Sequence, residues 1–205
     1  MKISPTLTEV KEIAKTGKYD ILPVSCEILS DFITPIEAMR ILQNVSTHCY
    51  LLESAQANEA WGRYTFLGYD PKLEINCIDG HMKLGKLSVE TENPSEYIRQ
   101  ILSEYKSPKF DYLPSFTGGL VGYFSYDYLG YKEKSIRGKA RDTEDFKDVD
   151  LMLFDKVIAF DNLCQKIILI ANMSLDAPET GYNKAIVELK QLRELLMHGE
   201  KKQNM

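Results

Sequence analysis

Short segments in which apolar and polar residues alternate recur along the chain, and turn residues separate them. Residues 73–78 and 82–89 alternate in this way around Asp79–Gly80, a pair that favours a two-residue hairpin turn. Residues 150–161 and 166–172 form a second pair of strand-like segments, separated by a short connection. Because these hairpins follow one another with few helical crossovers, we expect a mainly antiparallel β-sheet.

Further strands and helices complete an α+β pattern. Strands are expected at 20–29, 49–54, 63–69 and 119–126, and helices at 7–15, after Thr34, after Asn93 and at 182–197. Thr34 and Asn93 are each followed by proline and then, three residues on, by glutamate, the pattern of an N-terminal capping box. Pro23 indicates an edge strand or a strand start. We expect one α+β domain over residues 1–205, with helices packed on an antiparallel sheet.

Composition excludes several classes of function. The net charge is −5, and the basic residues are spread thinly, which argues against a surface that binds nucleic acid. No apolar run approaches the length that spans a membrane, and the first residues lack the apolar core of a signal peptide. The four cysteines stand far apart in the sequence, so we expect no zinc site: Cys26, Cys49, Cys77 and Cys164. We expect each to be a buried thiol, kept reduced in a cytoplasmic protein.

Motifs for nucleotide, metal and nucleophilic chemistry are absent. The chain has no G-x-x-x-x-G-K-[ST], no G-x-G-x-x-G after a strand, no H-E-x-x-H and no G-x-S-x-G. His48, His81 and His198 are isolated in the sequence, and the last two are most simply surface residues. We therefore expect no catalytic residue and no metal ligand in this chain.

A glycine-rich strand stands out from this background. Residues 117–127 read T-G-G-L-V-G-Y-F-S-Y-D, with glycines at 118, 119 and 122. Glycine inside a strand marks a bulge or a close backbone approach. The favoured interpretation is a kinked core strand packed under a neighbouring sheet. The alternative is a strand whose missing side chains leave room for another domain or a ligand.

The stretch from Leu51 to Gly68 is the second unusual feature. Glu53 and Ser54 end one strand, and Trp61 to Tyr64 begin the next after a polar loop. If the two strands pair, a carboxylate, a hydroxyl, backbone N–H groups and the Arg63 guanidinium meet at the mouth of the loop. Such groups match the ammonium and the carboxylate of an amino acid. The simpler alternative is a surface salt bridge between Glu53 and Arg63, which would contribute little.

Three segments of the sequence resemble a known family. L-L-E-S at 51–54, G-R-Y-T-F-L-G-Y-D-P at 62–71 and P-S-F-T-G-G-L-V-G-Y-F-S-Y-D at 114–127 resemble the chorismate-utilising enzymes. Within that family they look like the amino-terminal region of anthranilate synthase component I, and the likeness spans nearly the whole chain. Aminodeoxychorismate synthase component I, of the folate pathway, is a close relative and remains an alternative. A free-standing amino-acid-binding or interaction module is the alternative from another class.

The resemblance implies a regulatory role. In the family the carboxy-terminal half binds chorismate and magnesium and forms anthranilate and pyruvate, with ammonia from the glutamine amidotransferase component II. We expect this chain to lack that half, to carry no cofactor and to be inactive alone. The family's L-tryptophan site implies these effector-binding residues: Glu53, Ser54, Trp61, Gly62, Arg63 and Tyr64.

Overall fold

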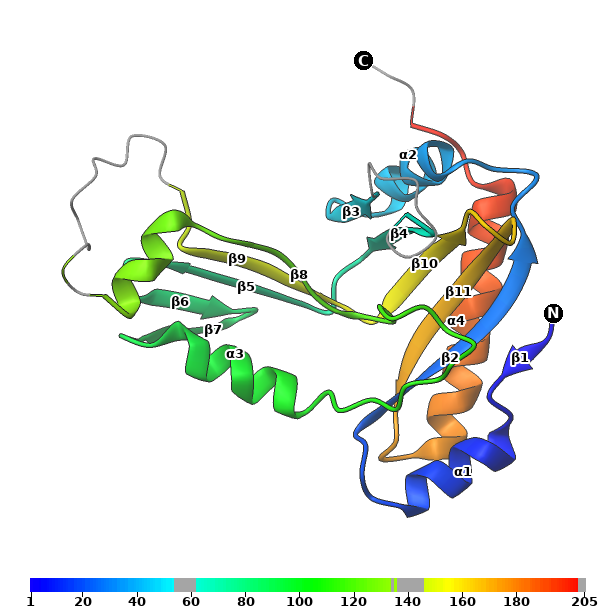
Figure 1. Ribbon diagram of the computed structural model, residues 1–205, viewed down its shortest axis with the longest axis horizontal. Coiled ribbons are helices and arrows are strands. Elements are labelled where there is room, and N and C mark those ends of the chain that lie inside the picture. The colour runs from blue at the N-terminus through cyan, green and yellow to red at the C-terminus, as the bar shows by residue number, and fades with distance from the viewer. Residues whose placement is uncertain (54–61, 134, 136–145, 203–205) are drawn as a thin grey trace. The chain divides into compact units, whose positions relative to one another are not determined.

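The computed structural model describes residues 1–53, 62–133, 135 and 146–202, and they form two compact units. The larger unit comprises Met1–Asp70, Tyr105–Gly118 and Asp155–Met205, and the smaller one Pro71–Glu104 and Gly119–Phe154. Each unit is built on its own antiparallel sheet (Figure 1). The α+β class and the antiparallel pairing are therefore confirmed, with the strands divided between two sheets.

The larger unit contains sheet A, in which the order is β1-β2-β11-β10-β4-β3. Its strands are β1 (Ile3–Ser4), β2 (Ile21–Leu29), β3 (Cys49–Leu52), β4 (Tyr64–Tyr69), β10 (Lys156–Asp161) and β11 (Lys166–Ser174). The β10–β11 hairpin occupies the centre, with Asp161 opposite Lys166. Pro23 of β2 lies opposite Asn172 of β11. The N–H of Asn172 points away from β2 and donates to the carbonyl of Asp155, so these two residues are not a hydrogen-bonded pair. The missing N–H of Pro23 therefore removes no bond between β2 and β11.

Both faces of sheet A are covered. Helices α1 (Leu7–Lys15), α2 (Pro35–Val45) and α4 (Pro178–His198) pack on one face (Figure 1). On the other face, Leu113 from the segment 105–118 packs with residues of β10 and β11 that include Ile168. A strand buried on both faces reads as a continuous apolar run, which explains the sequence K-I-I-L-I-A of β11.

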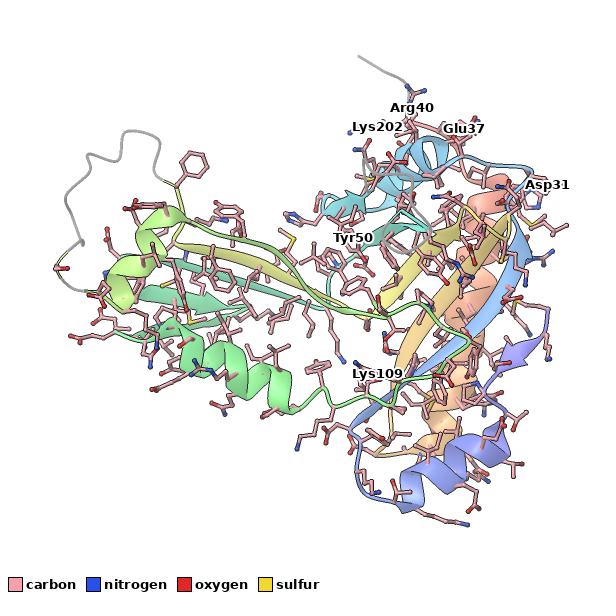
Figure 2. All side chains as sticks on the ribbon, in the orientation of Figure 1. Asp31, Glu37, Arg40, Tyr50, Lys109 and Lys202 are labelled. Atoms are coloured by element: carbon pink, nitrogen blue, oxygen red, sulfur yellow. The ribbon has the colours of Figure 1, made fainter. Side chains whose placement is uncertain are left out.

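The predicted start of α2 is confirmed, whereas the predicted start of α4 is wrong. Thr34 forms the expected capping box of α2, accepting the N–H of Glu37 while the Glu37 carboxylate accepts the N–H of Thr34. Helix α4 begins at Pro178, four residues before the predicted start, because proline is well suited to the first position of a helix. After α4 the chain returns to α2, where the N–H of Lys202 donates to the carbonyl of Arg40 (Figure 2).

The smaller unit contains sheet B, in which the order is β7-β6-β5-β9-β8. Its elements are β5 (Leu73–Ile78), β6 (His81–Leu84), β7 (Leu87–Glu90), α3 (Pro94–Ser103), β8 (Gly119–Phe124), the 3-10 helix η1 (Tyr126–Tyr131) and β9 (Val149–Phe154). Ile98 of α3 packs on one face of the sheet, against Ile75, Met82 and Leu151. Asn93 precedes α3 as expected, but its side chain makes no capping bond, so the predicted box is wrong there.

Two predicted strands are each divided in the structure. Residues 82–89 form β6 and β7, because Gly85 turns the chain with a φ of +59°. Residues 150–161 form β9 in sheet B and β10 in sheet A, with Asp155 between them. The carbonyl of Asp155 accepts both the N–H and the side-chain amide of Asn172, so this residue is fixed to sheet A at the point where the chain leaves sheet B.

The glycine-rich strand lies at a sheet edge, so the prediction of a buried core strand is wrong. β8 pairs only with β9 among the strands described, and Tyr123 and Phe124 are 40% and 49% exposed. The glycines are nevertheless required by the backbone. Gly122 has a φ of +152°, and a Cβ there would lie 2.0 Å from the carbonyl oxygen of Asp150. The glycine thus permits close pairing of β8 with β9.

The cysteine prediction holds for two of the four thiols. Cys26 and Cys77 are buried, Cys49 is half-buried and Cys164 is exposed. Burial raises the pKa of the Cys26 thiol to about 11, which keeps it neutral at physiological pH. Cys164 follows β10 in a turn, where its apolar sequence neighbours do not enclose it.

Replacing Gly122 by alanine tests the close approach of β8 and β9. Gly122→Ala should destabilise the smaller unit by on the order of 3 kcal/mol, because the new Cβ overlaps the backbone of β9. Gly85→Ala is the matched control in the same unit: Gly85 also has a positive φ, but a Cβ there meets only the end of the Leu73 side chain, at 3.1 Å, so about 1 kcal/mol is expected. Amide hydrogen exchange of β9 measures the effect, and equal costs for the two variants would contradict this account.

Candidate functional site

Strands β3 and β4 bring the two ends of the polar loop to one end of sheet A. They pair antiparallel, with Leu52 opposite Phe66, so Glu53 leaves the sheet where Arg63 enters it. Ser54 and Trp61, together with the residues between them, lie outside the described part of the chain. Glu53 is exposed and makes no ion pair with any described residue. The pairing on which the sequence argument depended is therefore present.

Arg63 pairs with Asp161, a residue 98 positions away, and this replaces the salt bridge to Glu53 considered from the sequence. The Arg63 Nε lies 3.0 Å from Oδ1 of Asp161, and Nη2 lies 2.6 Å from Oδ2. The Asp161 side chain is only 3% exposed, whereas that of Arg63 is 36% exposed. The hydrogen bonds from Arg63 lower the pKa of Asp161 and raise that of Arg63, so both groups are charged at neutral pH.

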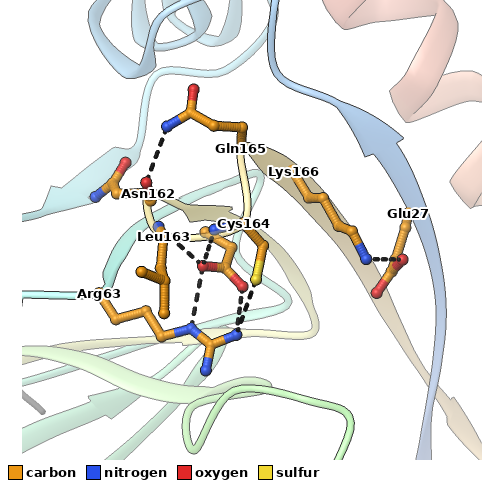
Figure 3. A network of polar contacts seen from close by, with 8 residues as sticks. Glu27, Arg63, Asn162, Leu163, Cys164, Gln165 and Lys166 are labelled. Carbon is orange, nitrogen blue, oxygen red and sulfur yellow. Dashed lines mark hydrogen bonds and ion pairs between the residues drawn. The ribbon is translucent and has the colours of Figure 1, made fainter. Parts of the chain in front are cut away.

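Asp161 also fixes the turn between β10 and β11. Its Oδ1 accepts the backbone N–H groups of Leu163 and Cys164, each at 3.1 Å. The Cys164 sulfur lies 3.6 Å from Nη2 of Arg63, so the start of β4 and this turn are held together (Figure 3). Sequence reasoning missed Asp161. The available signal was an aspartate at the end of a buried strand followed by Asn162 and a turn.

Aromatic side chains line the sheet beside this charged pair. The Arg63 guanidinium lies 4.9 Å from the centre of the Tyr64 ring. Tyr64 contacts Phe66, which meets Phe116 of the segment 105–118 edge-to-face at 5.6 Å. Tyr50 extends the cluster toward β3 (Figure 2). Glycine opposite Tyr50 is required, because a Cβ on Gly68 would lie 2.2 Å from the Tyr50 ring.

The arrangement combines polar recognition groups with an aromatic surface. Glu53 offers a carboxylate, and the partly exposed guanidinium of Arg63 keeps donors that Asp161 does not use. The aromatic rings begin at Tyr64, directly after these groups. Within the described residues no cluster of three or more His, Cys, Asp or Glu side chains is arranged to hold a metal. A carboxylate, a guanidinium with free donors and an aromatic surface are the kinds of group that match a small zwitterion.

None of the helices in the described ranges has both the length and the apolar character needed to span a bilayer.

The Arg63–Asp161 pair should make stability depend on pH. Folding lowers the pKa of Asp161, so its charged form stabilises the folded state at any pH above the pKa of an aspartate in the unfolded chain, near 4. This stabilisation is lost as the pH falls from there through the lower pKa of the folded state. Asp161→Asn should therefore cost roughly 3 kcal/mol at pH 7, and the difference from the unmodified protein should shrink below about pH 4.

Urea unfolding at pH 7, 5 and 3 measures this difference. Asp111→Asn is the control, since Asp111 is exposed and pairs with none of the described residues. A cost for Asp161→Asn that is the same at all three values of pH would show that its charge is not what stabilises the fold.

Comparisons with known proteins agree with the motifs. No family model matches the chain. Anthranilate synthase component 1 of Acetivibrio thermocellus is 34% identical over 198 residues, which cover 94% of this chain and 39% of that protein. The protein of the same name from Pseudomonas aeruginosa is 36% identical over 196 residues, or 92% of this chain and 39% of that protein. The chain thus spans about two fifths of the length of these curated relatives.

A solved structure extends the likeness to the fold. The crystal structure of anthranilate synthase component I from Streptococcus pneumoniae TIGR4 superposes with a TM-score of 0.52 at 25% identity. It covers 81% of this chain, which corresponds to 36% of that one. By sequence and by fold, the chain is therefore related to the amino-terminal region of anthranilate synthase component I.

Proposed function

We propose that the chain is the regulatory part of an anthranilate synthase component I, and that it binds L-tryptophan as feedback inhibitor at the loop between β3 and β4. One observation carries the proposal. The loop that follows L-L-E-S leaves and re-enters one end of sheet A, and Asp161 fixes the re-entry point through Arg63. Relatives that are 34% and 36% identical to this chain carry the name anthranilate synthase component 1.

Each residue at the loop has a proposed role. Glu53 binds the ammonium group of the amino acid, and Ser54 donates to or accepts from its polar head. The N–H of Gly62 and the free donors of Arg63 bind the carboxylate, while Trp61 and Tyr64 form the wall beside the indole. Because Asp161 already holds the guanidinium in place, little side-chain entropy remains to be lost when the carboxylate binds.

The parent reaction takes place on a second part of the enzyme. That part binds chorismate and magnesium and converts chorismate with ammonia to anthranilate and pyruvate. A glutamine amidotransferase, component II, supplies the ammonia, and the assembly works in the cytoplasm. Inhibition then requires that L-tryptophan bind one arrangement of the two parts more tightly than another.

An apolar edge of the smaller unit supports a contact with that second part. Side chains along and after β8 are large, apolar and exposed: Tyr123, Phe124, Tyr126, Leu129 and Phe146. An uncovered edge strand with apolar side chains favours association, and an apolar patch of this kind usually marks an interface. We propose that the chorismate-binding part covers this edge in the whole enzyme.

The purified chain should not form anthranilate. Residues 1–205 match about two fifths of the length of the relatives, and the proposal assigns chorismate and magnesium to the remainder of those enzymes. The fluorescence of anthranilate should therefore stay at background when residues 1–205 are incubated with chorismate, Mg²⁺ and an ammonium salt. Addition of a matching chorismate-binding part in trans is the positive control. Turnover by the chain alone would refute the division of labour proposed here.

A substitution at the loop tests the L-tryptophan site. Ser54→Phe places a ring at the polar head of the ligand, so an enzyme that joins this chain to a matching catalytic part should lose inhibition by L-tryptophan and keep its activity. Ser54→Ala removes one hydrogen bond, about 0.5–1.5 kcal/mol, and should weaken inhibition severalfold. Ser88→Phe, at an exposed serine of β7, is the control and should leave inhibition unchanged. Full inhibition of the Ser54→Phe enzyme would make the loop a structural connection only.

A further inference from the structure

A cavity lies on sheet A, apart from the loop between β3 and β4. Its volume is about 420 Å³, within the range of roughly 300–1,000 Å³ that is typical of small-molecule sites. Three distant parts of the chain enclose it: the start of the chain through β1, strands β2 and β11, and the segment 105–118. No residue of the candidate L-tryptophan site lines it.

Buried apolar side chains form the floor of the cavity. Ile168 of β11 and Leu113 of the segment 105–118 are 3% and 9% exposed and belong to one packed cluster. Tyr112 forms part of the wall, and its ring stacks on Phe110 with the centroids 5.1 Å apart. This surface suits a small hydrocarbon or aromatic body.

Polar groups stand on one side of this floor. Ser25 and Glu27 are two residues apart on β2, so their side chains point to the same face as Ile168, which lies opposite Glu27. The hydroxyl of Ser25 is buried and donates to the carbonyl of Ser4 at 3.2 Å, so it still offers an acceptor. Glu27 is held by Lys166 at 2.9 Å (Figure 3).

Two charged residues line the cavity, Lys2 and Glu27. The Glu27 carboxylate is already paired with Lys166, which lies outside the lining, whereas Lys2 forms no ion pair with any residue in the described ranges. With Lys166 included, the three side chains carry one net positive charge. A ligand with one negative charge therefore complements the site, because an ammonium group binds a carboxylate by a charge-assisted hydrogen bond.

We propose that this cavity binds a small organic monocarboxylate with an apolar body, its carboxylate at Lys2 and its body on Leu113 and Ile168. The site is independent of the proposed L-tryptophan site. It belongs to the larger unit alone, since every lining residue lies within that unit.

Titration of the ¹⁵N-labelled chain with 3-phenylpropanoate tests the site, and the uncharged 3-phenylpropanamide is the matched probe. The acid should shift the amide signals of Ser25, Leu113 and Ile168 saturably, and more tightly than the amide does. Lys2→Gln should weaken binding of the acid about fivefold and leave that of the amide within twofold. Lys18→Gln, at an exposed lysine outside the cavity, should change neither.

Three results would overturn the proposal. One is the absence of saturable shifts at these amides. Another is equal binding of the acid and the amide, with no effect of Lys2→Gln, which would leave only an apolar depression. The third is a set of shifts confined to the Arg63–Asp161 region, which would place the carboxylate at the other end of the sheet. Because L-tryptophan takes no part in the experiment, its outcome is separate from that of the proposed regulatory function.

Discussion

The buried carboxylate of Asp161 is the interaction on which this end of sheet A depends. A charge that is 97% enclosed is tolerated only when its lone pairs are engaged, and here two guanidinium N–H groups and two backbone N–H groups engage them. Removal of Arg63 would leave the Asp161 carboxylate buried without its cation, whereas Arg63 itself is partly exposed to solvent. The pair therefore fixes where β4 begins relative to the turn after β10, and specifies position more than it adds stability.

This constraint connects the fold to the proposed regulation. A binding loop is most selective when rigid elements hold its two ends, and here Glu53 directly follows β3 and Arg63 directly precedes β4 of the same sheet. Sheet A can serve as such a support because helices cover one face and the segment 105–118 the other. Sheet B differs, since apolar side chains along its β8 edge are exposed. In the proposed function, the larger unit binds the effector and the smaller unit contacts the second part of the enzyme.

Most features that depend on neighbours in sequence were predictable, with the Asn93 capping box and the start of α4 as exceptions, whereas features that depend on distant residues were not. The Thr34 capping box and the Asp79–Gly80 turn are local, and both are present. The place of β8 at an edge depends on the order of strands in sheet B, which no residue in 117–127 encodes by itself. The Asp161 partner of Arg63 was missed for the same reason, since the two come together only when β4 pairs with β10.

The most direct test of the account uses the single tryptophan of the chain, Trp61. In a ¹⁵N-labelled protein its indole N–H gives one side-chain signal, and unlabelled L-tryptophan adds none. Titration with L-tryptophan should shift that signal saturably, together with the amides of Gly62 and Arg63, and L-tryptophan amide, which lacks the carboxylate, should bind more weakly. An indole signal that stays in place at millimolar L-tryptophan, with the amides of Gly62 and Arg63 also unmoved, would contradict the assignment of this loop as the effector site.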